Sequence, residues 1–253
     1  MRADAGLVLF LAIAMLALFA LWYSVVCRRG VSRAEASIEA LTIAQPNFAA
    51  VGLPIIQAVI GPAGSVHVAL AIAAASVLPS PITLLVLKLG KGRNEDEPLR
   101  RKVAVALWRA LTKPVVVAPV AGILFSCLGI HLDALTVASL QLIGVSAGGV
   151  ALFVTGLVLS AQSLRFNATV VIGTIVAVIA QPLLVWCLAQ PLPVPAEQAR
   201  IAILLAAMPS GFFGILFGIS YKVRSQAVGS IVIASTMFSM VTLGLTIYWL
   251  FPA

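Results

Sequence analysis

Two short stretches, Gln45-Pro46-Asn47 and Met208-Pro209-Ser210-Gly211, each place a proline and polar neighbours in the middle of a long apolar segment. A proline inside a helix removes one backbone hydrogen bond and clashes with the preceding turn. Where lipid surrounds a helix, such a break is tolerated only inside protein or beside water. The two stretches therefore predict two interrupted helices whose breaks face the protein interior.

The composition indicates what surrounds these helices. Of 253 residues, 62% are hydrophobic and 9% are charged, whereas a soluble domain is about a quarter charged because its surface faces water. A helix of about 20 apolar residues crosses the hydrocarbon core of a bilayer. Apolar segments that fit this requirement lie at 6–26, 36–60, 65–89, 113–130, 134–162, 167–189, 198–221 and 226–250. The sequence therefore predicts an all-α integral membrane protein of about eight transmembrane helices.

The basic residues predict an orientation. The formal net charge is +8, and with these crossings every Lys and Arg except Arg2 and Arg200 falls on one side of the membrane. Because Lys and Arg gather in cytoplasmic loops, both termini are predicted to lie outside the cytoplasm in a multi-pass protein of the inner (plasma) membrane. The same placement makes the charges topology signals, so nucleic acid is not predicted as a partner.

An internal similarity relates the two ends of the chain. The stretches 75–84 and 234–243 share Ala, Ser, Ser, Thr and Leu at matching positions, and one segment earlier each half carries its mid-helix proline. Counting crossings makes the paired segments antiparallel, which is the inverted-repeat plan of many secondary transporters. The predicted parts are an N-terminal repeat of three helices (1–89), a basic cytoplasmic loop (90–112) and a C-terminal repeat of five helices (113–253). A five-plus-five plan needs two more helices, so the first repeat is expected to be incomplete.

The two breaks are the predicted substrate site. Asn47 and Ser210 are good helix N-cap residues, so each is expected to open the second half of its helix. The start of a half-helix offers free N–H groups and partial positive charge, which suit a carboxylate. The predicted substrate-binding residues are Gln45, Pro46, Asn47, Pro209, Ser210 and Gly211. Two ordinary proline kinks are the alternative interpretation.

Other polar residues in the apolar segments carry weaker signals. A row of hydroxyl side chains on each of the segments 65–89 and 226–250 either lines the transport path or consists of small residues that let helices pack closely. Its members are Ser76 and Ser80 on the first segment, and Ser235 and Ser239 on the second. Gln181-Pro182 resembles the two breaks more weakly. Glu35 and Glu39 stand near the start of segment 36–60, where we expect them to be solvated.

The sequence offers little support for catalysis or for a bound cofactor. Gly144-Val145-Ser146-Ala147-Gly148 matches the G-x-S-x-G pattern of hydrolases, but that chemistry needs a strand-to-helix turn with a His and an acid in reach. Here the pattern falls inside an apolar segment, where its glycines suit close helix packing. No phosphate-binding loop and no His-Glu-x-x-His is present. We therefore predict no enzyme activity, no cofactor and no metal site.

Several motifs resemble the auxin efflux carrier family. They are Ala44-Gln45-Pro46-Asn47-Phe48, Val51-Gly52-Leu53-Pro54, Lys113-Pro114, Gly122, Met208-Pro209-Ser210 and Ala234-Ser235-Thr236. The branch that the chain resembles most is that of the bacterial malonate transporters. The resemblance implies ten helices in two inverted repeats with two broken helices that cross, and a scaffold that mediates homodimerisation. It also implies that two helices of the family plan are missing from this chain.

The leading hypothesis is a secondary transporter that carries a small organic anion, such as a malonate-like carboxylate, by alternating access. Three alternatives differ from it in class. A passive channel would show conductance without saturation. A non-transporting fragment or subunit of a carrier would show no flux. A membrane enzyme would depend on Ser146.

Overall fold

The structure is a computed structural model. It describes residues 2–89, 100–101, 104–105, 108, 112, 117–118, 121–122, 124–125, 128–130, 132–192 and 194–252, without the side chains of residues 2–4, 145 and 148. The described residues form helices and no strand. Most of the predicted basic loop 90–112 and most of the apolar segment 113–130 lie outside them, as does Lys113-Pro114.

Three helices are long and uninterrupted: α1 (Arg2–Arg28), α8 (Ala134–Ser160) and α13 (Gln226–Leu250). Side-chain caps begin two of them. The Asp133 side chain accepts from the Thr136 N–H at 3.0 Å, and the Ser225 hydroxyl accepts from the Ala227 N–H at 3.2 Å. Each cap satisfies one of the N–H groups that a helix start leaves without a partner.

Five helices of the described residues are long and apolar enough to cross a membrane. They span Ala5–Arg28, Pro62–Leu89, Ala134–Ser160, Ala168–Ala189 and Gln226–Leu250. The segments 36–60 and 198–221 are the two interrupted helices, each half being shorter than a bilayer core. The prediction of an all-α membrane fold with two broken helices is therefore confirmed.

Two segments that the sequence predicts as single helices contain irregular turns. Segment 65–89 divides into α4 (Ser65–Val77) and α5 (Pro79–Leu89), with a short 3₁₀ turn, η2 (Pro62–Gly64), ahead of them. Segment 167–189 divides into α9 (Ala168–Ile175), a π-helical turn η3 (Val176–Ala180) and α10 (Gln181–Ala189). A proline lies at or just after each irregularity, and its missing N–H accounts for the lost helical hydrogen bond.

The two interrupted helices run through the interior of the bundle. The first consists of α2 (Arg33–Ala44), a π-helical turn η1 (Phe48–Gly52) and α3 (Leu53–Val59). The second consists of α11 (Ala196–Ala206) and α12 (Phe213–Tyr221). α2 packs against α1, α5, α12 and α13, while α11 packs against α1, α10 and α13. Both breaks are therefore surrounded by other helices, as the prolines require.

The apolar core has two parts, and the breaks lie where these parts meet. Phe48 and Met208 belong to a cluster built on the first half of α1, α4 and α11. Ile43 and Ala44 belong to a second cluster built on the second half of α1, α2, α9 and α13. The first interrupted helix thus leaves one cluster and enters the other at Pro46. This position places the break at mid-depth in the bundle.

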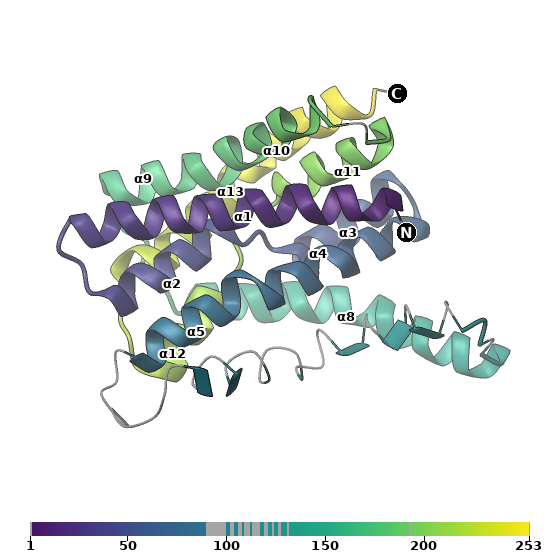
Figure 1. The fold of residues 1–253 in the computed structure, drawn as a ribbon, viewed down its shortest axis with the longest axis horizontal. Coiled ribbons are helices and arrows are strands. Elements are labelled where there is room, and N and C mark those ends of the chain that lie inside the picture. The colour runs from purple at the N-terminus through teal and green to yellow at the C-terminus, as the bar shows by residue number, and fades with distance from the viewer. Residues whose placement is uncertain are drawn as a thin grey trace.

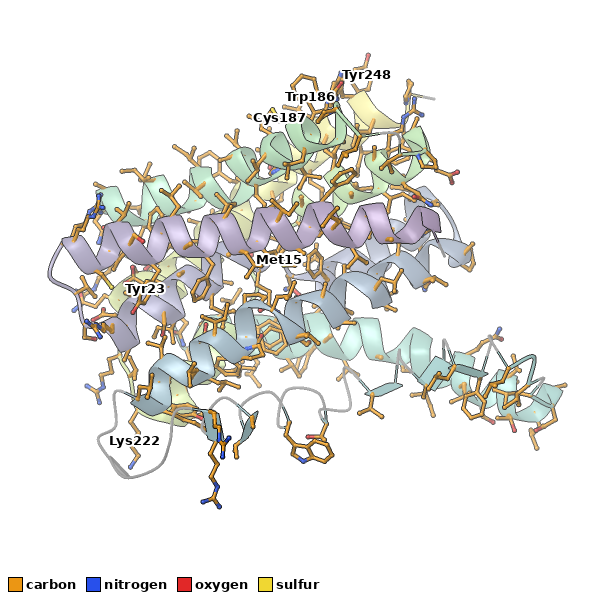
Figure 2. All side chains as sticks on the ribbon, in the orientation of Figure 1. Met15, Tyr23, Trp186, Cys187, Lys222 and Tyr248 are labelled. Carbon is orange, nitrogen blue, oxygen red and sulfur yellow. The ribbon has the colours of Figure 1, made fainter. Side chains whose placement is uncertain are left out.

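The two ends of the bundle differ in chemistry. Both termini lie at the same end of the bundle (Figure 1). Figure 2 shows Trp186 and Tyr248 at that end and Lys222 at the opposite one. The exposed residues Arg28 and Arg29 lie at the end of α1 and Arg224 follows α12, and both helices end on the side of the bundle where Lys222 lies (Figure 1). Figure 2 also shows Tyr23 toward the basic end, so aromatic side chains lie toward both ends while these basic residues gather at one, which is the pattern that membrane proteins show at their two interfaces.

Candidate functional site

The two breaks cross and bond to each other through their backbones. The Asn47 N–H donates to the Pro209 carbonyl and the Gly211 N–H donates to the Gln45 carbonyl, each at 2.8 Å. Together these bonds make an antiparallel bridge between Pro46 and Ser210. Backbone groups that the prolines release from the two helices thus find partners in each other, which is what a site at membrane depth requires. The name crossing is used below for residues 45–47 and 208–211.

Close approach of the two chains depends on glycine at two positions. A Cβ atom on Gly211 would lie 2.8 Å from the Gln45 carbonyl oxygen, inside van der Waals contact. A Cβ atom on Gly214 would lie 2.6 Å from the Ile38 carbonyl oxygen and would overlap the Thr42 hydroxyl. The first turn of α12 therefore packs directly on the backbone of α2, and a larger residue at either position would force the helices apart.

Asn47 begins the second half of the first interrupted helix, as the sequence predicts. Its side-chain oxygen accepts from the Ala50 N–H at 3.1 Å and caps η1. Because that oxygen is engaged, the NH₂ group of the Asn47 amide is the part that can donate to an anion. The Asn47 side chain is 5% exposed, so a ligand that met it would be almost completely desolvated.

The prediction that Ser210 caps the second half-helix is wrong. The N-cap of α12 is Phe212, and no side chain satisfies the first N–H groups of that helix. Ser210 lies two residues earlier, where the bridge to Pro46 holds it, and its N–H donates to the Ser235 hydroxyl at 3.1 Å. Its own hydroxyl is buried and has no hydrogen-bond partner among the described atoms. The crossing therefore contains an uncommitted hydroxyl donor, and an uncapped helix start follows it in the chain.

A third interrupted segment contributes Gln181, whose place in the site the sequence indicates only weakly. Its side-chain amide donates to the Ala44 carbonyl at 3.0 Å, at the C-terminal end of α2. Its carbonyl oxygen is buried and lacks a partner among the described atoms. The signal was the one shared by the other breaks, a polar residue beside a proline within an apolar segment. Because Gln181-Pro182 has no counterpart in the other half of the chain, the sequence alone does not distinguish it from an ordinary proline kink.

Of the four serines in the two predicted rows of hydroxyl side chains, two bond to residues of the crossing. Ser80 donates to the Gln45 side-chain oxygen at 3.2 Å, and Ser235 accepts from the Ser210 N–H. Ser76 is buried, and Ser239 is buried and donates within its own helix to the Thr236 carbonyl at 2.8 Å. Ser80 and Ser235 thus support the polar groups of the site. A role for the four serines in lining a path stays a prediction.

Uncharged groups dominate the crossing. Gln45, Asn47 and Ser210 are 3%, 5% and 1% exposed, so this conformation is closed to solvent. Positive potential comes from the start of α12, which has no side-chain cap. At the start of η1 the N–H groups of Phe48, Ala50 and Val51 are already bonded. An arrangement of amide, hydroxyl and backbone N–H donors in a dry site can bind a carboxylate without a cationic side chain.

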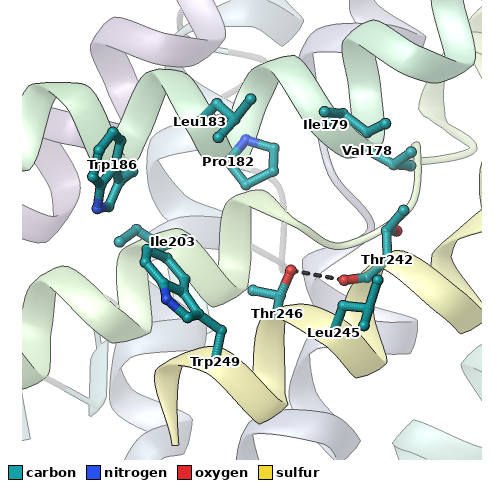
Figure 3. Close-up of a pocket in the computed structure, with 10 residues that line it drawn as sticks. All are labelled: Val178, Ile179, Pro182, Leu183, Trp186, Ile203, Thr242, Leu245, Thr246 and Trp249. Atoms are coloured by element: carbon teal, nitrogen blue, oxygen red, sulfur yellow. Dashed lines mark hydrogen bonds between the residues drawn. The ribbon is translucent and has the colours of Figure 1, made fainter.

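A separate hollow of about 280 Å³ lies between α10 and α13 (Figure 3). Its lining residues are Val178, Ile179, Pro182, Leu183, Trp186, Ile203, Thr242, Leu245, Thr246 and Trp249. The rings of Trp186 and Trp249 meet edge to face at 6.2 Å. The Thr246 hydroxyl donates within α13 to the Thr242 carbonyl at 2.7 Å, so its proton is not available to an anion. This apolar hollow suits hydrocarbon and not an anion.

Two further predictions concern residues outside the crossing. Ser146 of the hydrolase-like pattern lies within the continuous helix α8, and its hydroxyl donates to the Leu142 carbonyl at 2.9 Å. The expectation that Glu39 is solvated is wrong, because its side chain is 4% exposed. The reason is tertiary: Glu39 faces Ser225 at the start of α13, whose hydroxyl donates to it at 2.8 Å.

Comparison with known proteins agrees with this geometry. A family described as "Membrane transport protein" matches residues 5–247. The chain is 27% identical over 218 residues to the uncharacterized transporter YfdV of Escherichia coli (strain K12), an alignment that covers 86% of this chain and 69% of that protein. The proteins of the same name in Escherichia coli O157:H7 and Shigella flexneri match with the same identity and coverage.

Proposed function

The chain belongs to the membrane transport protein family, as its resemblance to auxin efflux carriers predicted, and on that premise we propose that it is a secondary transporter of a small organic anion. The single observation that carries the choice of anion is the crossing. Two interrupted helices bridge each other there, and an uncapped helix start lies beside the buried, uncommitted hydroxyl of Ser210. These donors have no acceptor, and the oxygens of a carboxylate would supply acceptors for them.

The proposed contacts follow from the donors that remain uncommitted. The Asn47 NH₂ group and the Ser210 hydroxyl each donate to a carboxylate oxygen, and the first N–H groups of α12 donate to the same ligand. A negative charge at a helix start gains about 0.3–1 kcal/mol when exposed and up to ~2 kcal/mol when partly buried. A malonate-like dicarboxylate is the substrate we favour, because each interrupted helix brings a donor to the crossing, the Asn47 amide on one and the Ser210 hydroxyl on the other.

Alternating access is the proposed mechanism. The crossing is closed to solvent in this conformation, so the substrate enters and leaves only when the surrounding helices move. We propose that the helices of residues 1–89 and 167–253 form the mobile part, with the two halves related as inverted repeats. We propose that α8 belongs to a scaffold. Against the described residues only 6% of its most apolar part is buried, so its surface is proposed to face the rest of the scaffold, lipid and the partner in a homodimer. We further propose the inner membrane, with both termini outside the cytoplasm.

Uptake of labelled malonate into proteoliposomes tests the proposal. Asn47→Ala removes a proposed donor together with the cap of η1. Asn167→Ala is the matched control, since the Asn167 side chain caps α9 in the same way, accepting from the Val170 N–H at 2.9 Å. Both variants lose a cap of about 1 kcal/mol. We expect a loss of uptake only in Asn47→Ala, and equal uptake by the two variants would remove the site assignment.

A further inference from the structure

A buried acid lies on the first interrupted helix, away from the proposed anion site. Glu39 stands in the middle of α2 with 4% of its surface exposed. One carboxyl oxygen accepts from the Ser225 hydroxyl at 2.8 Å, and the other is buried with no hydrogen-bond partner among the described atoms. The indole N–H of Trp22 on α1 is buried close enough to the same carboxyl to interact with it, although it does not reach ordinary hydrogen-bond geometry.

Neither of the two charged side chains that act on Glu39 through space bonds to it among the described atoms. The charges of Glu35 and Arg29 act on it through space, but Glu35 is another acid one turn away, and the Arg29 guanidinium donates to the Thr169 hydroxyl at 3.4 Å. The neighbouring elements and α2 itself bring other titratable groups to this end: Tyr23, Cys27, Arg28, Arg33, Lys88, Tyr221, Lys222 and Arg224. α13 and η3, which also pack against α2, carry no acidic or basic residue.

An unpaired buried carboxylate is costly. Moving a charge out of water is unfavourable unless a partner compensates it, and a single hydroxyl donor compensates a full charge only in part. Proton binding to the uncommitted oxygen removes the charge and supplies an O–H donor, while the other oxygen keeps its bond from Ser225. Release of the proton restores the carboxylate. Ionisable residues buried in membrane helices commonly have this role in proton relays.

The helices that meet at Glu39 are the ones that hold the crossing. α2 carries Glu39 and ends at the Ala44 and Gln45 carbonyls that accept from Gln181 and Gly211. At about 1.5 Å per residue, Gln45 lies ~9 Å along the helix from Glu39. α13 begins at Ser225 and, further along, its Ser235 accepts from the Ser210 N–H. A change at the contact of Glu39 with Ser225 therefore acts on two rigid elements that both reach the anion site.

We propose that Glu39 is a proton-binding site that couples movement of the anion to movement of protons across the membrane, an inference that rests on the proposed transport function. Glu39 takes up one proton in the conformation that faces one side and releases it in the conformation that faces the other. The proton and the anion occupy different sites and are linked through α2 and α13.

Two measurements on the intact protein test the inference separately from the transport function. Infrared difference spectra of the purified protein, recorded between acidic and mildly alkaline pH, detect protonation of a buried carboxyl group. We expect a protonated-carboxyl band in the wild type that is absent from Glu39→Gln and retained in Glu35→Gln. The Glu35 variant is the control because it removes the neighbouring acid on the same helix. A band that persists in Glu39→Gln would overturn the proposal, whether or not malonate is transported.

The second measurement compares two modes of malonate movement in proteoliposomes. A pH difference of about one unit concentrates a substrate carried with one proton about tenfold. We expect Glu39→Gln to lower gradient-driven accumulation far more than it lowers exchange at equal pH on both sides, and Glu35→Gln to leave the ratio of the two unchanged. Gradient-driven accumulation that survives in Glu39→Gln would contradict the coupling role. Absence of both modes in the wild type would instead reject malonate as the substrate.

A second variant, Ser225→Ala, keeps the assignment testable if Glu39→Gln does not fold. Ser225→Ala keeps the acid but removes the one hydroxyl that donates to it. We expect this variant to retain the infrared band and to shift the pH at which the band appears. An unshifted band would show that the titrating carboxyl is elsewhere, and would overturn the assignment to Glu39.

Discussion

Replacement of Gly211 by alanine tests how tightly the two broken helices must approach. The new Cβ atom would lie 2.8 Å from the Gln45 carbonyl oxygen, which is the acceptor of the Gly211 N–H. The backbones must therefore separate, and the bonds from Gly211 to Gln45 and from Asn47 to Pro209 lengthen together because they belong to one bridge.

The magnitude follows from these contacts. Overpacking of a filled interior costs about 1–3 kcal/mol, and each buried polar group left without its partner costs about 1–3 kcal/mol. With partial relaxation of the helices we expect a loss of about 2–4 kcal/mol. In a protein of this size that loss lowers the unfolding midpoint by roughly 5–15 °C. Malonate uptake should fall as well, because the donors at the crossing are displaced.

Thermal unfolding in detergent, followed by intrinsic fluorescence, measures the change in the unfolding midpoint. Uptake into proteoliposomes measures the change in malonate transport. Gly244→Ala is the matched control: Gly244 lies in α13, and a Cβ atom there would meet nothing within 4 Å. We expect its midpoint and uptake to stay near those of the wild type. If Gly211→Ala matched Gly244→Ala in both measurements, the close contact at the crossing would not matter for stability or transport, and the reasoning would be refuted.

Two further predictions concern other parts of the site and the fold. Gln181→Leu removes the donor to the Ala44 carbonyl, so we expect a lower unfolding midpoint from a loss of about 1–3 kcal/mol and a slower malonate uptake; unchanged values would exclude Gln181 from the site. Hydrogen bonds from the Thr136 hydroxyl and N–H hold the pKa of Asp133 below its ordinary value. The stability that this cap contributes is therefore present above the ordinary aspartate pKa, and it is lost as pH falls below about 4. Asp133→Asn should remove this acid-dependent change from unfolding midpoints measured across that range, and an unaltered pH profile would contradict the assignment.

The crossing itself could be predicted from the sequence because its cause is local. Pro46 and Pro209 cannot donate a backbone hydrogen bond, and each stands beside polar residues in a segment that must otherwise be helical and apolar. These facts fix where the helices break. The match between the two halves of the chain indicated that the breaks would meet. The predicted crossing of the two broken helices is confirmed by the Pro46–Ser210 bridge.

The details that the sequence did not predict depend on distant contacts. Ser210 has the right side chain for a cap, but the bridge across to Pro46 holds its backbone in an extended conformation, so the helix starts later. Glu39 lies in the middle of α2, in a segment start that local reasoning places near water, yet it is buried against Ser225, which is 186 residues away in the chain. No pattern along one segment reports such a neighbour.

Contact between the anion and the crossing can be measured directly by solid-state NMR. Asparagine occurs at positions 47, 94 and 167, so protein labelled with ¹⁵N in the asparagine side-chain amides, mixed with ¹³C-carboxyl malonate, reports dipolar dephasing between ligand and amide. If the Asn47 amide contacts the anion, we expect dephasing in the wild type that disappears in Asn47→Ala and remains in Asn167→Ala. Dephasing that is unchanged in Asn47→Ala, or absent from wild-type protein that demonstrably binds malonate, would contradict it.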